Sequence, residues 1–267
     1  MTTPIGFFDS GVGGLSVWRE GVQWLPAEHT IYYADNAYCP YGAKAPDEII
    51  ARSMHIVDFL LKHECKLIVV ACNTATAAAI DCLRARYAVP FVGMGPAVKP
   101  AAQHSVSGVV GVLATRGTFK GRFYHETLAQ FAADVQVIEQ PGDGLVELAE
   151  AGLTDSDEAR ALLQQYIQPM LDAGADYLVL GCTHYPFFLP AIARITGDRM
   201  TVIDPAPAVA QRIKFLLTQH NLLNTSGDEA RHEFFSSGDL KMVRETAKWL
   251  MESMSRTEKP GDRDSMS

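Results

Sequence analysis

Two of the five cysteines in the 267-residue sequence stand at the same kind of position, directly after an apolar run typical of a buried strand. Cys72 follows LIVVA and precedes NT, and Cys182 follows YLVLG and precedes THYP. Ligands of open α/β sheets bind beyond the carboxyl ends of the strands, where a nearby helix N-terminus favours a thiolate. The two positions therefore predict reactive thiols, and the alternative for each is a small buried hydrophobic residue.

The chemistry that best uses two equivalent thiols is proton transfer at a stereocentre. One thiolate removes a proton from one face of a carbon atom, and the other thiol delivers a proton to the opposite face. The reverse reaction exchanges the two roles, so both groups must be of the same type. Each thiol also needs a polar neighbour that helps to deprotonate it, for which Asp9 and His184 are the candidates.

Other functions use fewer of these residues. A cysteine hydrolase would pair Cys182 with His184 as nucleophile and base, which leaves Cys72 unexplained. A redox pair would usually be a C-x-x-C motif, which the sequence lacks. A two-lobed protein that binds an amino acid without turning it over is the non-enzymatic alternative, and it would need neither thiol.

Further polar segments lie at predicted strand ends, and each has a purely structural alternative. DSGVGG (9–14) offers a carboxylate, a hydroxyl and glycines whose N–H groups can approach an anion, or it is a tight turn. DNAYCPYG (35–42) is a turn-rich loop that contacts a ligand or merely connects two elements. The threonines of LATRGT (113–118) and the NT at 73–74 bind an amino acid or cap a helix.

Short apolar runs alternate with longer helical patterns along the chain. Several runs are apolar on consecutive residues, which is typical of strands covered on both faces, as in a parallel sheet. Helical spacing marks residues 45–65, which open with Pro46, and residues 157–174, which stop at Gly174. The runs that predict strands are 5–9, 30–35, 66–72, 90–95, 108–114, 135–140, 177–182 and 201–205. This alternation predicts an α/β fold, followed by a frayed polar tail at 252–267.

The chain also looks doubled. PIGFFDSGVGG near the start parallels GVVGVLATRGT, and LIVVACNT parallels YLVLGCTH. We expect two similar domains with mainly parallel sheets, related by a pseudo-twofold axis, with the active site in the cleft between them. The first comprises residues 1–98 and 208–267 and carries Cys72, and the second comprises residues 99–207 and carries Cys182.

Composition and charge exclude several classes of partner. A formal net charge of -8 with scattered Lys and Arg gives no general attraction for nucleic acid or an anionic membrane. No apolar run reaches the ~20 residues of a membrane helix, and the N-terminus shows no secretion signal. An odd number of cysteines without a C-x-x-C pair disfavours disulfides and a zinc site. We therefore expect a cytoplasmic protein with free thiols and no metal.

Eight segments in order resemble the glutamate racemases of the aspartate/glutamate racemase family. They are IGFFDSGVGGLSV, YADNAYCPYG, VVACNTATAAA, GPAVKPA, GVLATRGT, VELAEAG, LVLGCTHYP and VIDPA, within residues 4–206. The resemblance implies no cofactor, a homodimer, and interconversion of L- and D-glutamate that supplies D-glutamate for peptidoglycan synthesis. The related aspartate racemases tend to carry Glu after GCT, where this chain has His184, so glutamate is favoured over aspartate.

The resemblance also implies roles for single residues. Cys72 and Cys182 match the two catalytic cysteines of the family, assisted by Asp9 and His184 respectively. Because no cofactor serves as an electron sink, neutral hydroxyls and amides around the substrate carboxylate must stabilise the carbanion. The remaining matched positions imply substrate binding by Ser10, Pro40, Tyr41, Gly42, Asn73, Thr74, Thr115, Thr118, Thr183 and Glu150.

Overall fold

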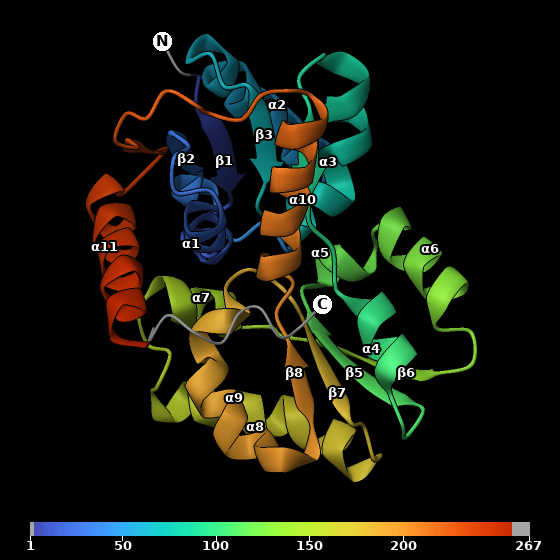
Figure 1. Cartoon of the computed structure of the whole chain (residues 1–267). Helices are drawn as coiled ribbons and strands as arrows, with labels where there is room; N and C mark the ends of the chain where they lie inside the picture. Colours follow the sequence, from blue (N-terminus) through green and yellow to red (C-terminus); the bar gives the residue numbers. More distant parts are fainter. Residues whose placement is uncertain (1–2, 258–267) are drawn as a thin grey trace.

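The computed structural model describes residues 3–257, whose strands form two sheets with every strand pair parallel (Figure 1). The first sheet contains β1 (Ile5–Asp9), β2 (Thr30–Ala34), β3 (Leu67–Val70), β4 (Phe91–Gly93) and β9 (His232–Ser236). The second contains β5 (Val109–Ala114), β6 (Gln136–Pro141), β7 (Tyr177–Gly181) and β8 (Thr201–Ile203). The strand orders are β4-β3-β1-β2-β9 and β6-β5-β7-β8, so the predicted α/β fold with parallel sheets is confirmed.

Helices cover both faces of each sheet (Figure 1). Those around the first sheet are α1 (Leu15–Trp24), α2 (Pro46–Lys62), α3 (Asn73–Arg86), α10 (Ala206–Gln219) and α11 (Leu240–Thr257). Those around the second are α4 (Val98–His104), α6 (Arg122–Phe131), α7 (Leu145–Glu150), α8 (Asp157–Asp172) and α9 (Leu189–Thr196), with the short α5 (Arg116–Phe119) nearby. Three single turns of 3-10 helix complete the elements, at Asn36–Tyr38, Tyr185–Phe188 and Gly197–Arg199.

Consecutive apolar residues in the strands reflect this double coverage. Phe7 of β1 belongs to the apolar cluster with α1 and α10, whereas Phe8 belongs to the cluster with α2 and α3, and both side chains are fully buried. In the second sheet, Leu113 packs with α7 and α8, and Val112 packs with α4 and α6. A strand covered by helices on both faces buries consecutive side chains, which is why the apolar runs of β1 and β5 were recognisable.

The chain crosses twice between the two layered units. Helix α4 follows β4 but contacts β5 and β7, and α10 follows β8 but contacts α1 of the first unit. Figure 1 shows α10 rising from β8 toward the first sheet. We propose on this basis that the domains are residues 1–98 with 208–267, and residues 99–207.

Two elements differ from the sequence predictions. Strand β9 went unpredicted because it is an edge strand with mostly half-buried residues, so its apolar signal is weak. Helix α11 continues through Thr257, where a frayed tail was predicted from residue 252. Extending a helix that has already formed costs little, and Lys248 pairs with Glu252 one turn on. The rest of the predicted tail, residues 258–267, lies outside the described residues.

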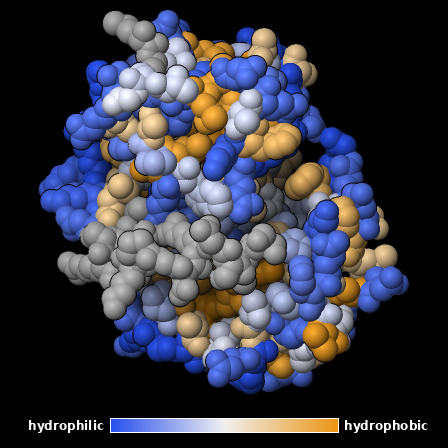
Figure 2. Space-filling model, in the orientation of Figure 1, coloured by the Kyte–Doolittle hydropathy of each residue, from blue (hydrophilic) through white to orange (hydrophobic). Residues whose placement is uncertain are grey.

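Hydrophilic residues cover much of the surface but leave some apolar side chains exposed (Figure 2). Figure 2 shows hydrophilic residues over much of one face, with apolar surface over the upper part of α10. Phe215 of α10 is 54% exposed, and Trp249 of α11 is 56% exposed. Within residues 3–257, no helix combines the length and the apolar character needed to cross a membrane.

Candidate active site

Most of the predicted site residues meet where the carboxyl ends of the central strands of the two sheets face each other. Both thiols and His184 line one small cavity there. Val146 of α7 also lines it and went unpredicted, because a Val in an apolar helix carries no signal of a site. The other residues around the cavity are Ser10, Pro40, Tyr41, Gly42, Asn73, Thr74, Thr115 and Thr183.

Three predicted residues lie behind the cavity wall. Asp9 is fully buried beneath Ser10, and Glu150 contacts His184. Thr118 Oγ1 lies 2.9 Å from Thr115 Oγ1 and donates to the Gly181 carbonyl at 3.4 Å. These three side chains do not line the cavity, but each forms a hydrogen bond with a residue that does.

The Cys72 thiol is held at the start of a helix and beside a buried carboxyl group. Its Sγ accepts the Ala75 N–H at 3.4 Å as the N-cap of α3 and lies 3.9 Å from Ser10 Oγ. Burial and then the Asp9 charge raise the pKa of the Cys72 thiol well above its ordinary value, and the Ala75 N–H opposes them. Burial also raises the pKa of Asp9, against the nearby charge of His184. Positive charge brought into the cavity would favour ionisation of the Cys72 thiol.

The Cys182 thiol is held beside an imidazole that a carboxylate orients. Its Sγ lies 3.7 Å from His184 Nδ1, and His184 Nε2 lies 2.6 Å from Glu150 Oε1. Burial lowers the pKa of His184, but hydrogen bonds to Cys182, Cys39 and Glu150 raise it well above the ordinary value. Burial opposes ionisation of Glu150, yet His184 holds the pKa of this carboxyl below its ordinary value. The 2.6 Å contact thus favours the imidazolium form of His184 and the carboxylate form of Glu150 beside the second thiol.

Glycines in the DSGVGG turn let the two lobes approach closely. A side chain on Gly13 would begin 2.4 Å from His184 Nδ1, and one on Gly11 would begin 1.9 Å from Glu150 Oε1. The Val12 N–H donates to Glu150 Oε1 at 2.7 Å. The turn was predicted to offer its N–H groups to an anion, and in the structure that anion is a carboxylate of the protein itself.

The buried amide of Asn73 offers a donor and an acceptor to a ligand of the cavity. Its side chain is almost fully buried and lines the cavity. Neither Oδ1 nor Nδ2 finds a hydrogen-bond partner among the residues that the structure describes. Leaving a buried polar group unpaired costs roughly 1–3 kcal/mol, so a polar ligand of the cavity would be stabilised by this amide. The helix is capped by Cys72 instead, which excludes the capping alternative for Asn73.

The cavity is closed by hydrogen bonds that run from lobe to lobe. Thr74 Oγ1 lies 2.8 Å from Thr115 Oγ1, and Thr183 Oγ1 donates to Asp9 Oδ2 at 3.3 Å. Thr115 also caps α5 by accepting the Thr118 N–H, which confirms the capping alternative, and it lines the cavity, so its binding of substrate stays a prediction. The enclosed volume is about 10 Å³. That is room for about one water, so an amino acid enters only if lobes or loops move apart.

The loop after β2 forms one wall and is firmly anchored. The Tyr41 hydroxyl donates to Asp35, and Arg52 donates to both oxygens of the same carboxylate at 2.9 and 2.6 Å. A bidentate Arg–carboxylate contact fixes orientation as well as position. The loop therefore lines the cavity, and its predicted contact with a ligand stays a prediction.

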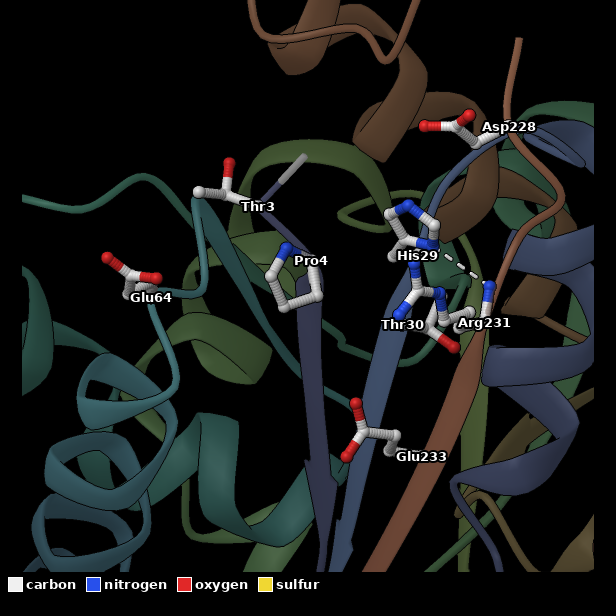
Figure 3. Close-up of a pocket in the computed structure, with 8 residues that line it drawn as sticks. All are labelled: Thr3, Pro4, His29, Thr30, Glu64, Asp228, Arg231 and Glu233. Atoms are coloured by element: carbon white, nitrogen blue, oxygen red, sulfur yellow. Dashed lines mark hydrogen bonds between the residues drawn. The ribbon is translucent and has the colours of Figure 1, made fainter. Parts of the chain in front are cut away.

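A larger cavity of about 360 Å³ lies elsewhere and is a poor candidate for the site (Figure 3). It lies at the amino ends of β1, β2 and β9, whereas ligands of parallel sheets bind at the carboxyl ends. Its lining includes Glu64, Asp228 and Glu233, and its His29 accepts the Arg231 backbone N–H at 2.9 Å. The closed cavity with the thiols remains the site.

Comparisons with known proteins show which family the chain is similar to. The family model for Asp/Glu/Hydantoin racemase matches residues 5–213. A glutamate racemase of Roseiflexus sp. is 52% identical over 221 residues, covering 82% of this chain and 81% of that protein. The crystal structure of Francisella tularensis glutamate racemase with D-glutamate has a TM-score of 0.81 and 29% identity over 94% of both chains. That of the Escherichia coli enzyme with L-glutamate and the activator UDP-MurNAc-Ala has a TM-score of 0.79 and 35% identity over 95% of both chains.

Proposed function

Because the chain belongs to the Asp/Glu/Hydantoin racemase family and is an isomerase, we propose that it interconverts L- and D-glutamate without a cofactor, by proton transfer between two thiols. The observation that carries the proposal is the pair of thiols, one from each lobe, on the walls of one closed cavity. Relatives that share about half of their residues with this chain are glutamate racemases, and one related structure contains D-glutamate.

Binding of glutamate uses the polar groups of the cavity. The unpaired amide of Asn73 and the hydroxyls of Ser10, Thr74 and Thr183 are neutral donors for the substrate carboxylate. They stabilise the negative charge that spreads onto this carboxylate when the α-proton leaves. The substrate ammonium brings the positive charge that favours ionisation of the buried Cys72 thiol.

The reaction is one proton removed and one proton delivered. A thiolate on one side takes the α-proton and becomes a thiol, and the C–H electron pair stays on the substrate as a carbanion. The thiol on the other side gives its proton to the opposite face and becomes a thiolate. Asp9 takes up or returns the proton of Cys72, and His184 does so for Cys182, with Glu150 orienting the imidazole.

The cellular role follows from the substrate. We propose that the product D-glutamate supplies peptidoglycan synthesis, and that the enzyme works in the cytoplasm, where thiols stay reduced. All five cysteines are free in the structure. The Escherichia coli relative binds UDP-MurNAc-Ala as an activator, which supports a link to cell-wall precursors.

We also propose that the enzyme is a homodimer. Large apolar side chains such as Phe215 and Trp249 are more than half exposed, and a second copy offers a surface that would cover them. Sedimentation equilibrium at micromolar concentration should give twice the chain mass of 29.2 kDa. A single species at the chain mass would contradict the dimer.

A circular dichroism assay on D-glutamate tests the proposed activity. With purified protein and no added cofactor, the signal should decay to zero as the enantiomers reach equal amounts. D-aspartate in a parallel cuvette should lose its signal at least tenfold more slowly, since His184 favours glutamate. An unchanged D-glutamate signal would contradict the activity, and faster loss with aspartate would contradict the substrate.

A further inference from the structure

A third thiol lies beside the His184–Glu150 pair and is not one of the two proposed proton carriers. Cys39 belongs to the loop after β2, Glu150 ends α7, and His184 follows β7. One ligand atom from each of the three lies within 4.8 Å of the others, and no other such group occurs in residues 3–257. Three separated segments of the chain thus bring together one sulfur, one nitrogen and one oxygen ligand.

We propose that Cys39, Glu150 and His184 bind Zn²⁺, and that the bound ion arrests the enzyme. Zinc takes thiolate, imidazole and carboxylate ligands at about 2.0–2.3 Å, and three protein ligands leave a fourth position for water. The thiolate disfavours Mg²⁺ and Ca²⁺, which take oxygen ligands. Zinc was not predicted from the sequence because these ligands have no short spacing, unlike those of a zinc finger.

The site needs only a small rearrangement to close around an ion. Ligand atoms of a tetrahedral zinc site lie roughly 3.3–3.8 Å apart, given those bond lengths. The present contact of 2.6 Å between His184 Nε2 and Glu150 Oε1 must therefore widen by roughly 0.7 Å, and the ion replaces the shared proton. Binding releases two protons to solvent, one from the Cys39 thiol and one from His184 Nε2.

An ion can reach this group from solvent while the catalytic cavity stays closed. Cys39 and Glu150 line a separate open cavity of about 330 Å³. Glu147 and Asp239 also line it, so the approach carries negative charge that attracts a cation. The inner cavity with both catalytic thiols holds about 10 Å³, so an aqueous ion meets Cys39 first.

The surroundings keep the carboxylate in place. The Val12 N–H donates to Glu150 Oε1 at 2.7 Å, an outer contact of the kind that orients metal ligands. Because Gly11 has no side chain, the space between Glu150 and Cys39 is open on its side. A Cβ atom on Gly11 would lie 3.1 Å from Cys39 Sγ. The backbone therefore both supports the ligand and leaves room for the ion.

Bound zinc takes away the imidazole that Cys182 needs. With the ion on Nε2 and on Glu150, His184 loses its orienting carboxylate and can no longer cycle a proton with Cys182. The inhibition rests on the proposed racemase function, whereas the binding of the ion does not.

Cobalt absorption tests the site without using activity. Co²⁺ titrated into the protein should give a thiolate-to-cobalt charge-transfer band in the near ultraviolet, and Zn²⁺ should abolish it. The Cys39→Ala variant should lose the band, and Cys82→Ser should keep it, because Cys82 is an exposed thiol away from the site. Near-ultraviolet circular dichroism checks that both variants are folded.

The same variants separate this proposal from the racemase proposal. Zn²⁺ should inhibit wild type and Cys82→Ser at the same concentration, and Cys39→Ala should need at least tenfold more for the same fractional loss of its own metal-free activity. An unchanged cobalt band or unchanged zinc inhibition in Cys39→Ala would place the ion on another thiol and overturn the site. A band that depends on Cys39 in a protein without racemase activity would support the site and refute the proposed function instead.

Discussion

The two halves of the active site place their thiols alike but surround them differently. Cys72 follows β3 and Cys182 follows β7, each at the carboxyl end of a central strand. Cys72 has a buried carboxyl group as its neighbour, and the helix that it caps supplies an N–H group. Cys182 has an imidazole that a carboxylate from α7 orients. The two similar sheets place the thiols at matching positions, and in the proposed mechanism the unlike neighbours give each thiol a different partner for its proton.

This difference has a thermodynamic limit. Because L- and D-glutamate have equal free energy, kcat/KM must be the same in both directions at every pH, whatever surrounds each thiol. The unequal neighbours can therefore make kcat and KM differ between the two directions, provided that their ratio stays the same. They can also make the two enantiomers differ in α-hydrogen exchange that occurs without inversion. Variants of the two sides should be compared in those quantities.

Removal of either thiol should have the largest effect. Cys72→Ser and Cys182→Ser should each lower racemisation by roughly 10³-fold, because general acid–base groups contribute about 10²–10⁴-fold. Each variant should still exchange the α-hydrogen of one enantiomer with D₂O, and the two variants should differ in which one. Proton NMR of each enantiomer measures the exchange. If both variants exchanged the same enantiomer, the thiols would not face opposite sides of the substrate.

Removal of the thiols' neighbours should come next. Asp9→Asn and His184→Gln should each lower kcat by roughly 10²-fold, because the thiol remains but its proton partner is gone. Their ratios of kcat between the two directions should move apart while kcat/KM stays equal in both. Progress curves from each pure enantiomer supply these constants. Wild-type kcat in either variant would remove that residue from the mechanism.

The Glu150–His184 pair should make stability depend on pH. Glu150, with a lowered pKa, stabilises the fold above about pH 4.5 and loses this contribution as pH falls through its folded pKa. His184, with a raised pKa, stabilises the fold below about pH 6.5 and loses this contribution as pH rises through its folded pKa. Both contributions to the free energy of unfolding are therefore fully present between about pH 4.5 and 6.5.

Glu150→Gln should therefore cost most between about pH 4.5 and 6.5, by roughly 2 kcal/mol, since the bond that it weakens joins charged groups. Denaturant unfolding of both proteins at pH 5.5 and at pH 9 measures the difference. Without the carboxylate the pKa of His184 should fall. The alkaline limb of the pH–activity profile should therefore lie at a lower pH in the variant than in wild type. The same unfolding difference at both pH values would mean that the pair carries no charge.

A pair of tyrosines gives the smallest contrast between the sides. The Tyr41 hydroxyl donates to the Asp35 carboxylate on the Cys72 side, and the Tyr185 hydroxyl donates to the Gly142 carbonyl at 3.2 Å on the Cys182 side. Tyr41→Phe should lower the free energy of unfolding by about 2 kcal/mol and Tyr185→Phe by about 1 kcal/mol, because a charged acceptor binds more strongly. Urea unfolding ranks the two. The reverse order would show that the loop anchor at Asp35 adds little.

Local patterns were enough to predict all strands except β9, and the strand-end positions of the two thiols. The runs LIVV of β3 and YLVLG of β7 are apolar on consecutive residues, and each is closely followed by its cysteine and further polar residues. The stop at Gly174 was also predictable, because its φ of 81° favours glycine. Each of these features is determined by residues adjacent in the sequence, so a short stretch of the sequence is enough to predict it.

Contacts between distant segments were not predictable in the same way. Glu150 stands 34 residues before His184, and Val12 stands 138 residues before Glu150, so no spacing reveals that they touch. The glycines of the first turn suggested an anion but not that Glu150 supplies it. Cys39 joins this group only because the loop after β2 folds against the other lobe.

The early appearance of deuterium tests the two-thiol mechanism most directly. Pure L-glutamate or D-glutamate is incubated with the enzyme in D₂O, and mass spectrometry follows deuterium at the α-carbon of each enantiomer over the first few per cent of conversion. Two opposed thiols predict deuterium in the product enantiomer while the remaining substrate stays protiated, from either starting side. A product that keeps its hydrogen, or a substrate pool that gains deuterium as fast as the product, would contradict the mechanism.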